Sequence, residues 1–136
     1  MKLKELIAAY KALGEAKVTK LESAEVLKII KARKAMRPFA EEYEAFLKDC
    51  QEKFKPVTWD EIQVKAQKWD TLTDDEKKDL NIVLMEYNNK INSAILEEIE
   101  KEVEVSVEKL NEESLTNILQ ENGWEVKRLE DLEVLV

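Results

Sequence analysis

The chain has 136 residues and a formal net charge of −8, and 38% of its residues are charged while 44% are hydrophobic. It contains no histidine, one cysteine, two glycines and two prolines, which excludes Ser-His and Cys-His catalytic pairs, histidine metal sites and glycine-rich phosphate loops. No apolar run approaches the roughly 20 residues that span a bilayer. We therefore expect one soluble, cytoplasmic domain over residues 1–136 with no membrane segment, and the lone Cys50 fits a reducing compartment.

Charge is distributed unevenly along the chain. Residues 1–56 carry a net charge of +4, and residues 57–136 carry a net charge of −12. Acidic surface repels phosphate, so the composition disfavours nucleic acid as a general partner. The two halves could instead attract each other, within one chain or between two copies.

The first half of the chain predicts two helices. The spacing of Leu3, Leu6 and Leu13 indicates a short amphipathic helix, and Gly14 stands where its C-terminal cap is expected. A second, much longer helix is predicted over 23–54, with a kink near Pro38 because the apolar spacing of three and four persists through that proline. The apolar positions of this helix are Val26, Ile29, Ile30, Met36, Phe39, Tyr43, Phe46, Leu47, Cys50 and Phe54.

Two capping boxes follow. Thr58 with Glu61 predicts the start of a helix over 58–69, and Thr73 with Glu76 predicts the start of a helix of about 25 residues. The latter has the length to lie antiparallel to the 23–54 helix. The sequence therefore predicts a mainly α fold built on a long antiparallel helical hairpin over roughly 23–100, with shorter helices at its ends.

The spacing of the apolar residues changes after residue 100. Val103, Val105 and Val107 alternate with polar residues, which predicts a small β element near residues 102–108. Because a single strand is not stable alone, we expect it to pair with residues 17–21, with residues 124–126 or with the same strand of a second subunit. A short helix and an apolar, docked tail complete a C-terminal strand-helix-tail segment over 101–136.

Carboxylates are the only groups present in numbers that suit catalysis or metal binding. Glu41 with Glu44, and Glu76 with Asp79, each lie three residues apart on a predicted helix, so each pair presents oxygens on one face. Two such pairs on neighbouring helices could hold Mg²⁺, as helical nucleotide pyrophosphohydrolases do, and Glu76-Lys77-Lys78-Asp79 is similar to one of their half-motifs. The other half-motif lacks its third carboxylate here. We favour solvated helix faces, and expect no metal and no cofactor.

The basic run Lys28, Lys31, Arg33, Lys34 and Arg37 is the strongest candidate for anion or nucleic-acid contact. No exposed aromatic residues interleave with it, and the net charge opposes phosphate binding. An internal salt-bridged face is the preferred interpretation.

Taken in order, the segments of the chain resemble a family of small, uncharacterised helical-hairpin proteins encoded by bacteriophages and prophages. The resemblance is carried by KVTKLESAEVLKIIKARKAM entering the long helix, by FAEEYEAF, by the EVEVSV strand and by the final LEDLEVLV. It implies an intracellular, phage-derived setting and a role in assembly or regulation.

We therefore expect a non-enzymatic interaction or assembly protein with an unidentified protein partner. We also expect a homodimer, which self-associates through the uncovered part of the 23–54 helix or through Val103, Val105 and Val107. The alternative is a Mg²⁺-dependent nucleotide hydrolase that uses Glu41, Glu44, Glu76 and Asp79.

Overall fold

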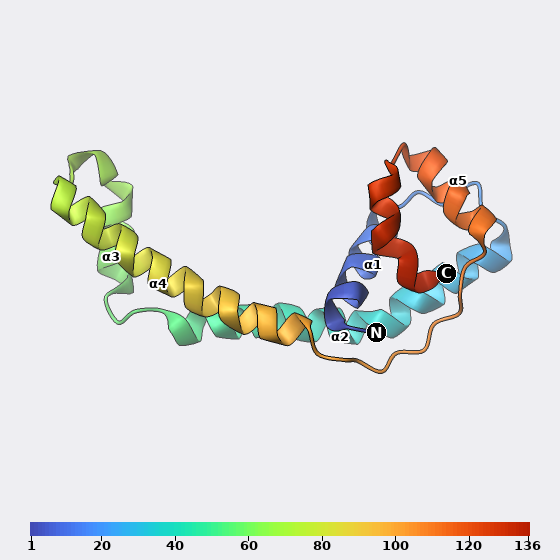
Figure 1. The fold of residues 1–136 in the computed structure, drawn as a ribbon, viewed down its shortest axis with the longest axis horizontal. Coiled ribbons are helices and arrows are strands. Elements are labelled where there is room, and N and C mark those ends of the chain that lie inside the picture. Colours follow the sequence, from blue (N-terminus) through green and yellow to red (C-terminus); the bar gives the residue numbers. More distant parts are fainter. The chain divides into compact units, whose positions relative to one another are not determined.

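The computed structural model describes the backbone of residues 1–136 and every side chain except that of Val126. The chain is mainly α-helical, as predicted (Figure 1). It divides into two compact units. The first unit combines Met1–Glu44 with Ile99–Val136, and the second unit is Ala45–Glu98. Its elements in order are α1 (Leu3–Glu15), α2 (Ser23–Phe54), α3 (Trp59–Gln67), the 3₁₀ helix η1 (Trp69–Thr71), α4 (Asp74–Ile99), α5 (Glu112–Asn122) and the 3₁₀ helix η2 (Val126–Leu135). No helix among the described residues combines the length and the apolar character that crossing a membrane requires.

The first unit is built around α1, which packs beside η2 (Figure 1). Helical spacing places Leu3, Leu6 and Leu13 on one side of α1, where all three are buried. Ile29 and Met36 of α2 join the same apolar cluster. The tail docks as predicted, since Leu132 and Leu135 of η2 are 0% and 1% exposed.

The predicted β element is reduced to one antiparallel bridge between Lys2 and Glu102. The backbone N–H of Leu3 donates to the carbonyl of Lys101 at 2.9 Å, and that of Val103 donates to the carbonyl of Met1 at 2.9 Å. The partner of this segment is thus the start of α1, and not 17–21 or 124–126. Residues 103–110 form no strand, because their valines pack on the helical core rather than on a sheet.

α2 is one continuous helix with Pro38 inside it, as the unbroken apolar spacing predicts. Two details differ from expectation. Ile30, predicted on the apolar side, is 57% exposed. Gly14 does not cap α1, because the helix ends at Glu15 and Ala16 is its C-cap residue. Gly14 instead permits close approach of Arg33, since a Cβ at this position would lie 3.2 Å from Arg33 Nη2.

α5 is capped at both ends by its own sequence. The side chain of Asn111 accepts a hydrogen bond from the backbone N–H of Ser114 at 2.7 Å, which satisfies one of the unpaired donors at the start of the helix. Gly123 ends the helix with φ of 62°, the left-handed conformation that glycine adopts without steric cost. Both caps follow from residue type.

The second unit contains the end of α2, α3, η1 and most of α4. Cys50, Ile62 and Leu80 are its buried residues. The Tyr87 hydroxyl donates to the carbonyl of Gln51 at 3.3 Å, and the Tyr87 ring lies 4.8 Å from that of Trp59.

Only one of the two predicted capping boxes forms. The Thr73 hydroxyl accepts from the backbone N–H of Glu76 at 3.2 Å, and the Glu76 carboxylate accepts from Thr73 in return. Thr58 precedes α3 but makes no capping hydrogen bond, because its ψ of 20° lies outside the extended region that a capping residue needs.

Candidate functional site

The four carboxylates of the enzyme alternative are divided between the two units. Glu41 and Glu44 are exposed on the α2 part of the first unit, whereas Glu76 and Asp79 are exposed on α4 in the second. Glu76 and Asp79 line an open pocket of about 240 Å³ together with Glu61 and Lys65 of α3. This pocket is the place where α3 and α4 bring acidic side chains together.

The Glu76 carboxylate is already engaged in this pocket, because it accepts hydrogen bonds from Thr73 in the capping box of α4. Among the described residues, no group of three or more Asp, Glu, Cys or His side chains has an arrangement that could hold a metal ion. The pocket therefore offers scattered, solvated carboxylates rather than a set of oxygen ligands converging on one point.

The valines predicted to mediate self-association lie against their own unit. Val103 is 7% exposed and belongs to the core cluster, and Val105 and Val107 are half-buried against it. They are fixed by the bridge to the N-terminal residues and by the hydrogen bond from the backbone N–H of Leu110 to the carbonyl of Leu135. Little of their apolar surface is left for a second chain.

The basic run of α2 separates into two groups. Lys28 pairs with Glu25 at 3.3 Å, and the guanidinium of Arg33 stacks 4.9 Å from the centre of the Tyr10 ring. Lys31, Lys34 and Arg37 are exposed and have no ion-pair partner among the described side chains. The predicted salt-bridged face thus accounts for only part of the run, and three cations face solvent.

These free cations lie beside an apolar groove that the sequence did not predict. The groove has a volume of about 590 Å³ and is lined by Val18, Thr19, Leu21, Ser23, Val26, Leu27 and Ile30. Leu27 and Ile30 are 49% and 57% exposed and lie one turn before Lys31 and Lys34 on the solvent side of α2. A signal was present in the sequence, because Leu27 falls outside the predicted apolar spacing and therefore had no core to enter.

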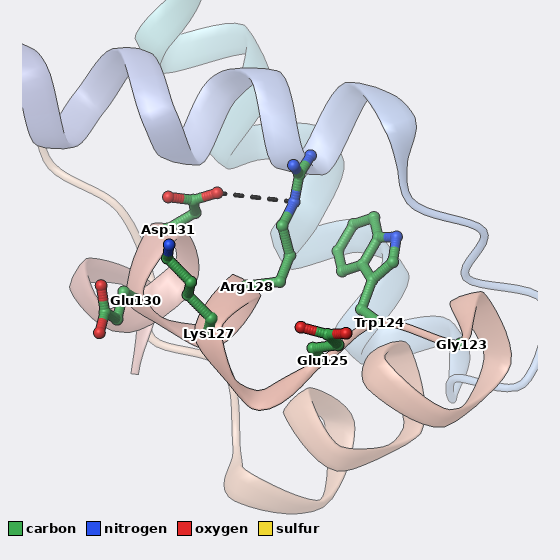
Figure 2. A pocket seen from close by; sticks show the side chains of 7 residues that line it. All are labelled: Gly123, Trp124, Glu125, Lys127, Arg128, Glu130 and Asp131. Carbon is green, nitrogen blue, oxygen red and sulfur yellow. Dashed lines mark ion pairs between the residues drawn. The ribbon is translucent and has the colours of Figure 1, made fainter.

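The pocket in Figure 2 is formed by η2 and the turn before it. The guanidinium of Arg128 lies 4.8 Å from the centre of the Trp124 ring, and its Nε lies 3.5 Å from Asp131 (Figure 2). Its Nη2 also pairs with Glu15 of α1. The pocket holds about 430 Å³, but its arginine is already paired and exposed Glu125 and Glu130 surround it. These contacts fasten η2 to α1 and occupy the guanidinium of Arg128.

Ion pairs and hydrogen bonds also hold the two ends of the first unit together. The Glu100 carboxylate accepts hydrogen bonds from Lys2 at 2.8 Å and from Lys4 at 2.5 Å, and these bonds lower its pKa to about 2. The Glu121 carboxylate at the end of α5 accepts from the Thr19 hydroxyl and from the backbone N–H of Lys20, which lowers its pKa. These charges have structural partners, so we assign them no catalytic role.

A second unpartnered apolar surface lies on α4. Ile82, Met85 and Leu96 are 46%, 62% and 63% exposed, on the side of the helix opposite buried Leu80. The residues between them at the same helical spacing are Asn89 and Asn92. This row of five residues, which we term the α4 seam, carries no charge within a chain that is 38% charged.

Comparisons of the chain with models of protein families, with curated proteins and with solved structures found no significant match. The candidate sites are therefore two apolar surfaces, the groove at residues 18–30 and the α4 seam. Both surfaces present large apolar side chains, which another chain could cover.

Proposed function

We propose that this chain is a non-enzymatic interaction or assembly protein of the cytoplasm, of phage or prophage origin, and that it acts as a homodimer with a protein partner. The phage origin rests on the order of its segments, from the helix entry at 17–36 to the final LEDLEVLV. A gene neighbourhood of phage structural or regulatory genes is the observation that would support it.

The observation that carries the interaction role is the exposure of large apolar side chains on both units. Leu27 and Ile30 in the first unit, and Met85 and Leu96 in the second, are each at least 49% exposed. Single exposed apolar residues are ordinary, but grouped ones at helical spacing are typical of surfaces that another chain covers. Covering them returns roughly 25 cal/mol for each Å² removed from water.

The groove at residues 18–30 also indicates the chemistry of its partner. Lys31, Lys34 and Arg37 continue its solvent face, so a segment with apolar side chains followed by carboxylates would complement it. A helix that inserts two apolar side chains one turn apart has the matching spacing. We therefore expect the protein partner to present an acidic amphipathic helix.

Sedimentation equilibrium of the full chain tests the homodimer. We expect a reversible equilibrium between the 15.9 kDa chain and a species of twice that mass as protein concentration rises. A single 15.9 kDa species across the whole concentration range would contradict the homodimer.

A competition experiment tests the protein-binding role of the groove. We would take any candidate partner from the same gene neighbourhood and compare its binding to the wild type, to Ile30→Glu and to the control Val64→Glu on α3. Both residues are exposed, at 57% and 51%, so both substitutions leave the core intact. Loss of binding with Ile30→Glu alone supports the groove, and equal binding by all three proteins would contradict it.

A further inference from the structure

We infer that the α4 seam pairs with the same seam of a second copy in antiparallel orientation, with Met85 opposite Leu96 of the partner subunit. This inference rests on the proposed homodimer and goes further, because it names the interface and its register. The valines at 103–107, which the sequence favoured for this role, are packed into their own unit.

The spacing of the seam is that of a coiled coil. Ile82, Met85, Asn89, Asn92 and Leu96 are separated by three, four, three and four residues, the alternation that keeps side chains on one line along paired helices. From Ile82 to Leu96 the seam is about 21 Å long at 1.5 Å per residue. The neighbouring position on its N-terminal side is the exposed Lys78, which bounds the apolar surface.

The part of the seam from Met85 to Leu96 is also symmetric about its centre. Met85 lies four residues before Asn89, and Leu96 lies four residues after Asn92. A two-fold axis midway between Asn89 and Asn92 therefore places Met85 opposite Leu96 and Asn89 opposite Asn92 of the partner subunit, while Ile82 has no counterpart within the seam. Two amides that face each other can exchange hydrogen bonds, which fixes the register as a buried Asn does in coiled coils.

The helix dipoles favour the antiparallel orientation. Both ends of α4 are acidic, with Asp74, Asp75 and Glu76 in the first turn and Glu97 and Glu98 in the last, so these side chains do not distinguish the two orientations. Parallel pairing would align the two helix dipoles, whereas antiparallel pairing opposes them. The uncharged centre of the seam lets two copies approach although each chain carries −8.

The short seam predicts a weak dimer, because its length allows far less contact than the roughly 800 Å² per partner of a standard interface.

The charge of the second unit predicts how the dimer responds to salt. The second unit carries eight Lys and twelve Asp or Glu, so two copies of it repel each other and added salt should strengthen the dimer. Attraction between the basic half of one chain and the acidic half of another would instead weaken with salt.

Charge exchange across the seam tests the interface and its register together. Full-length Met85→Lys, Leu96→Glu and the double variant are compared with wild type by sedimentation equilibrium, with circular dichroism to verify that helix content is unchanged. Each single variant buries an unpaired charge at the seam, and we expect its dimer dissociation constant to rise at least tenfold. The double variant places the introduced lysine of one copy opposite the introduced glutamate of the other, and we expect its dissociation constant to recover to within about threefold of wild type.

Two matched variants serve as controls. Val64→Lys repeats the apolar-to-lysine change on exposed α3, and Leu27→Glu repeats the apolar-to-glutamate change on the groove. Neither should alter the dimer. A wild-type dimer that Met85→Lys leaves intact would overturn the seam while the homodimer stands, and a wild-type monomer would overturn both. A double variant that stays dissociated would overturn the antiparallel register, and dissociation by Leu27→Glu would move the interface to the groove.

Discussion

Asn111 joins the start of α5 to the start of α2, and replacing it with alanine should destabilise the first unit. Its Oδ1 accepts the backbone N–H of Ser114 at 2.7 Å, and its Nδ2 donates to the Glu25 carboxylate at 2.7 Å. Glu25 is 6% exposed, and its second oxygen, Oε2, is buried without a hydrogen-bond partner. Asn111→Ala would leave this carboxylate with Lys28 as its one remaining partner among the described side chains.

The magnitude follows from the two lost contacts. Removal of an N-cap side chain costs about 1 kcal/mol, and loss of a hydrogen bond to a charged group costs about 1.5–3 kcal/mol. We therefore expect Asn111→Ala to lower the free energy of unfolding by roughly 2–4 kcal/mol. Asn111→Ser keeps an oxygen for the cap and loses the donor to Glu25, so its effect should be smaller than that of alanine.

Urea denaturation followed by circular dichroism measures these differences. Thr116→Ala is the control, because it removes an exposed side-chain hydrogen bond to the carbonyl of Glu112 within the same helix. It should change stability by less than about 0.5 kcal/mol. If Asn111→Ala also stays within about 0.5 kcal/mol of wild type, the link that Asn111 makes between α2 and α5 does not stabilise the unit and the reasoning is refuted.

Other substitutions test separate parts of the account. Glu100→Gln should lower the melting temperature at pH 7. Hydrogen bonds from Lys2 and Lys4 hold the pKa of Glu100 near 2 in the folded chain, against 4.5 in the unfolded chain. The difference in melting temperature between wild type and variant should therefore be complete above pH 4.5, shrink as the pH falls and be lost near pH 2. Thermal melts of both proteins from about pH 2 to 7 check this, and a constant difference would contradict it. Pro38→Ala should be neutral or stabilise by about 1 kcal/mol, since it restores a hydrogen bond inside continuous α2, and a large loss in urea denaturation would show that the proline is required. Calorimetric titration with Mg²⁺ or Mn²⁺ should show no tight stoichiometric site; a tight site that Glu76→Ala abolishes would favour the hydrolase.

Local chemistry predicted much of the fold. The long helices, the passage of α2 through Pro38, the Thr73–Glu76 capping box and the glycine that ends α5 follow from periodicity and residue type. The docked tail follows from its apolar residues. These features depend on neighbours in the sequence, so the sequence alone specifies them.

Features that depend on distant partners were predicted less well. The alternation at 103–107 indicates a strand, but the hydrogen-bond partners at 101–103 are the first residues of the chain, which no local pattern identifies. Ile30 fits the apolar spacing of α2 yet is exposed, because the core contacts Ile29 and Met36 instead. The α4 seam could not be identified from the sequence for a related reason. Its two asparagines are ordinary polar residues of an exposed helix face, and the face on which they lie is known only once the structure shows which side of α4 is buried.

Hydrogen exchange measured at low and high protein concentration tests the central claim most directly, because it reports both association and its location. We expect peptides that cover residues 82–96 to exchange more slowly at high concentration, while peptides that cover 18–30 and 103–107 exchange at the same rate in both samples. Concentration-dependent protection at 103–107 or 18–30 in place of 82–96, or at no position, would contradict dimerisation through the α4 seam.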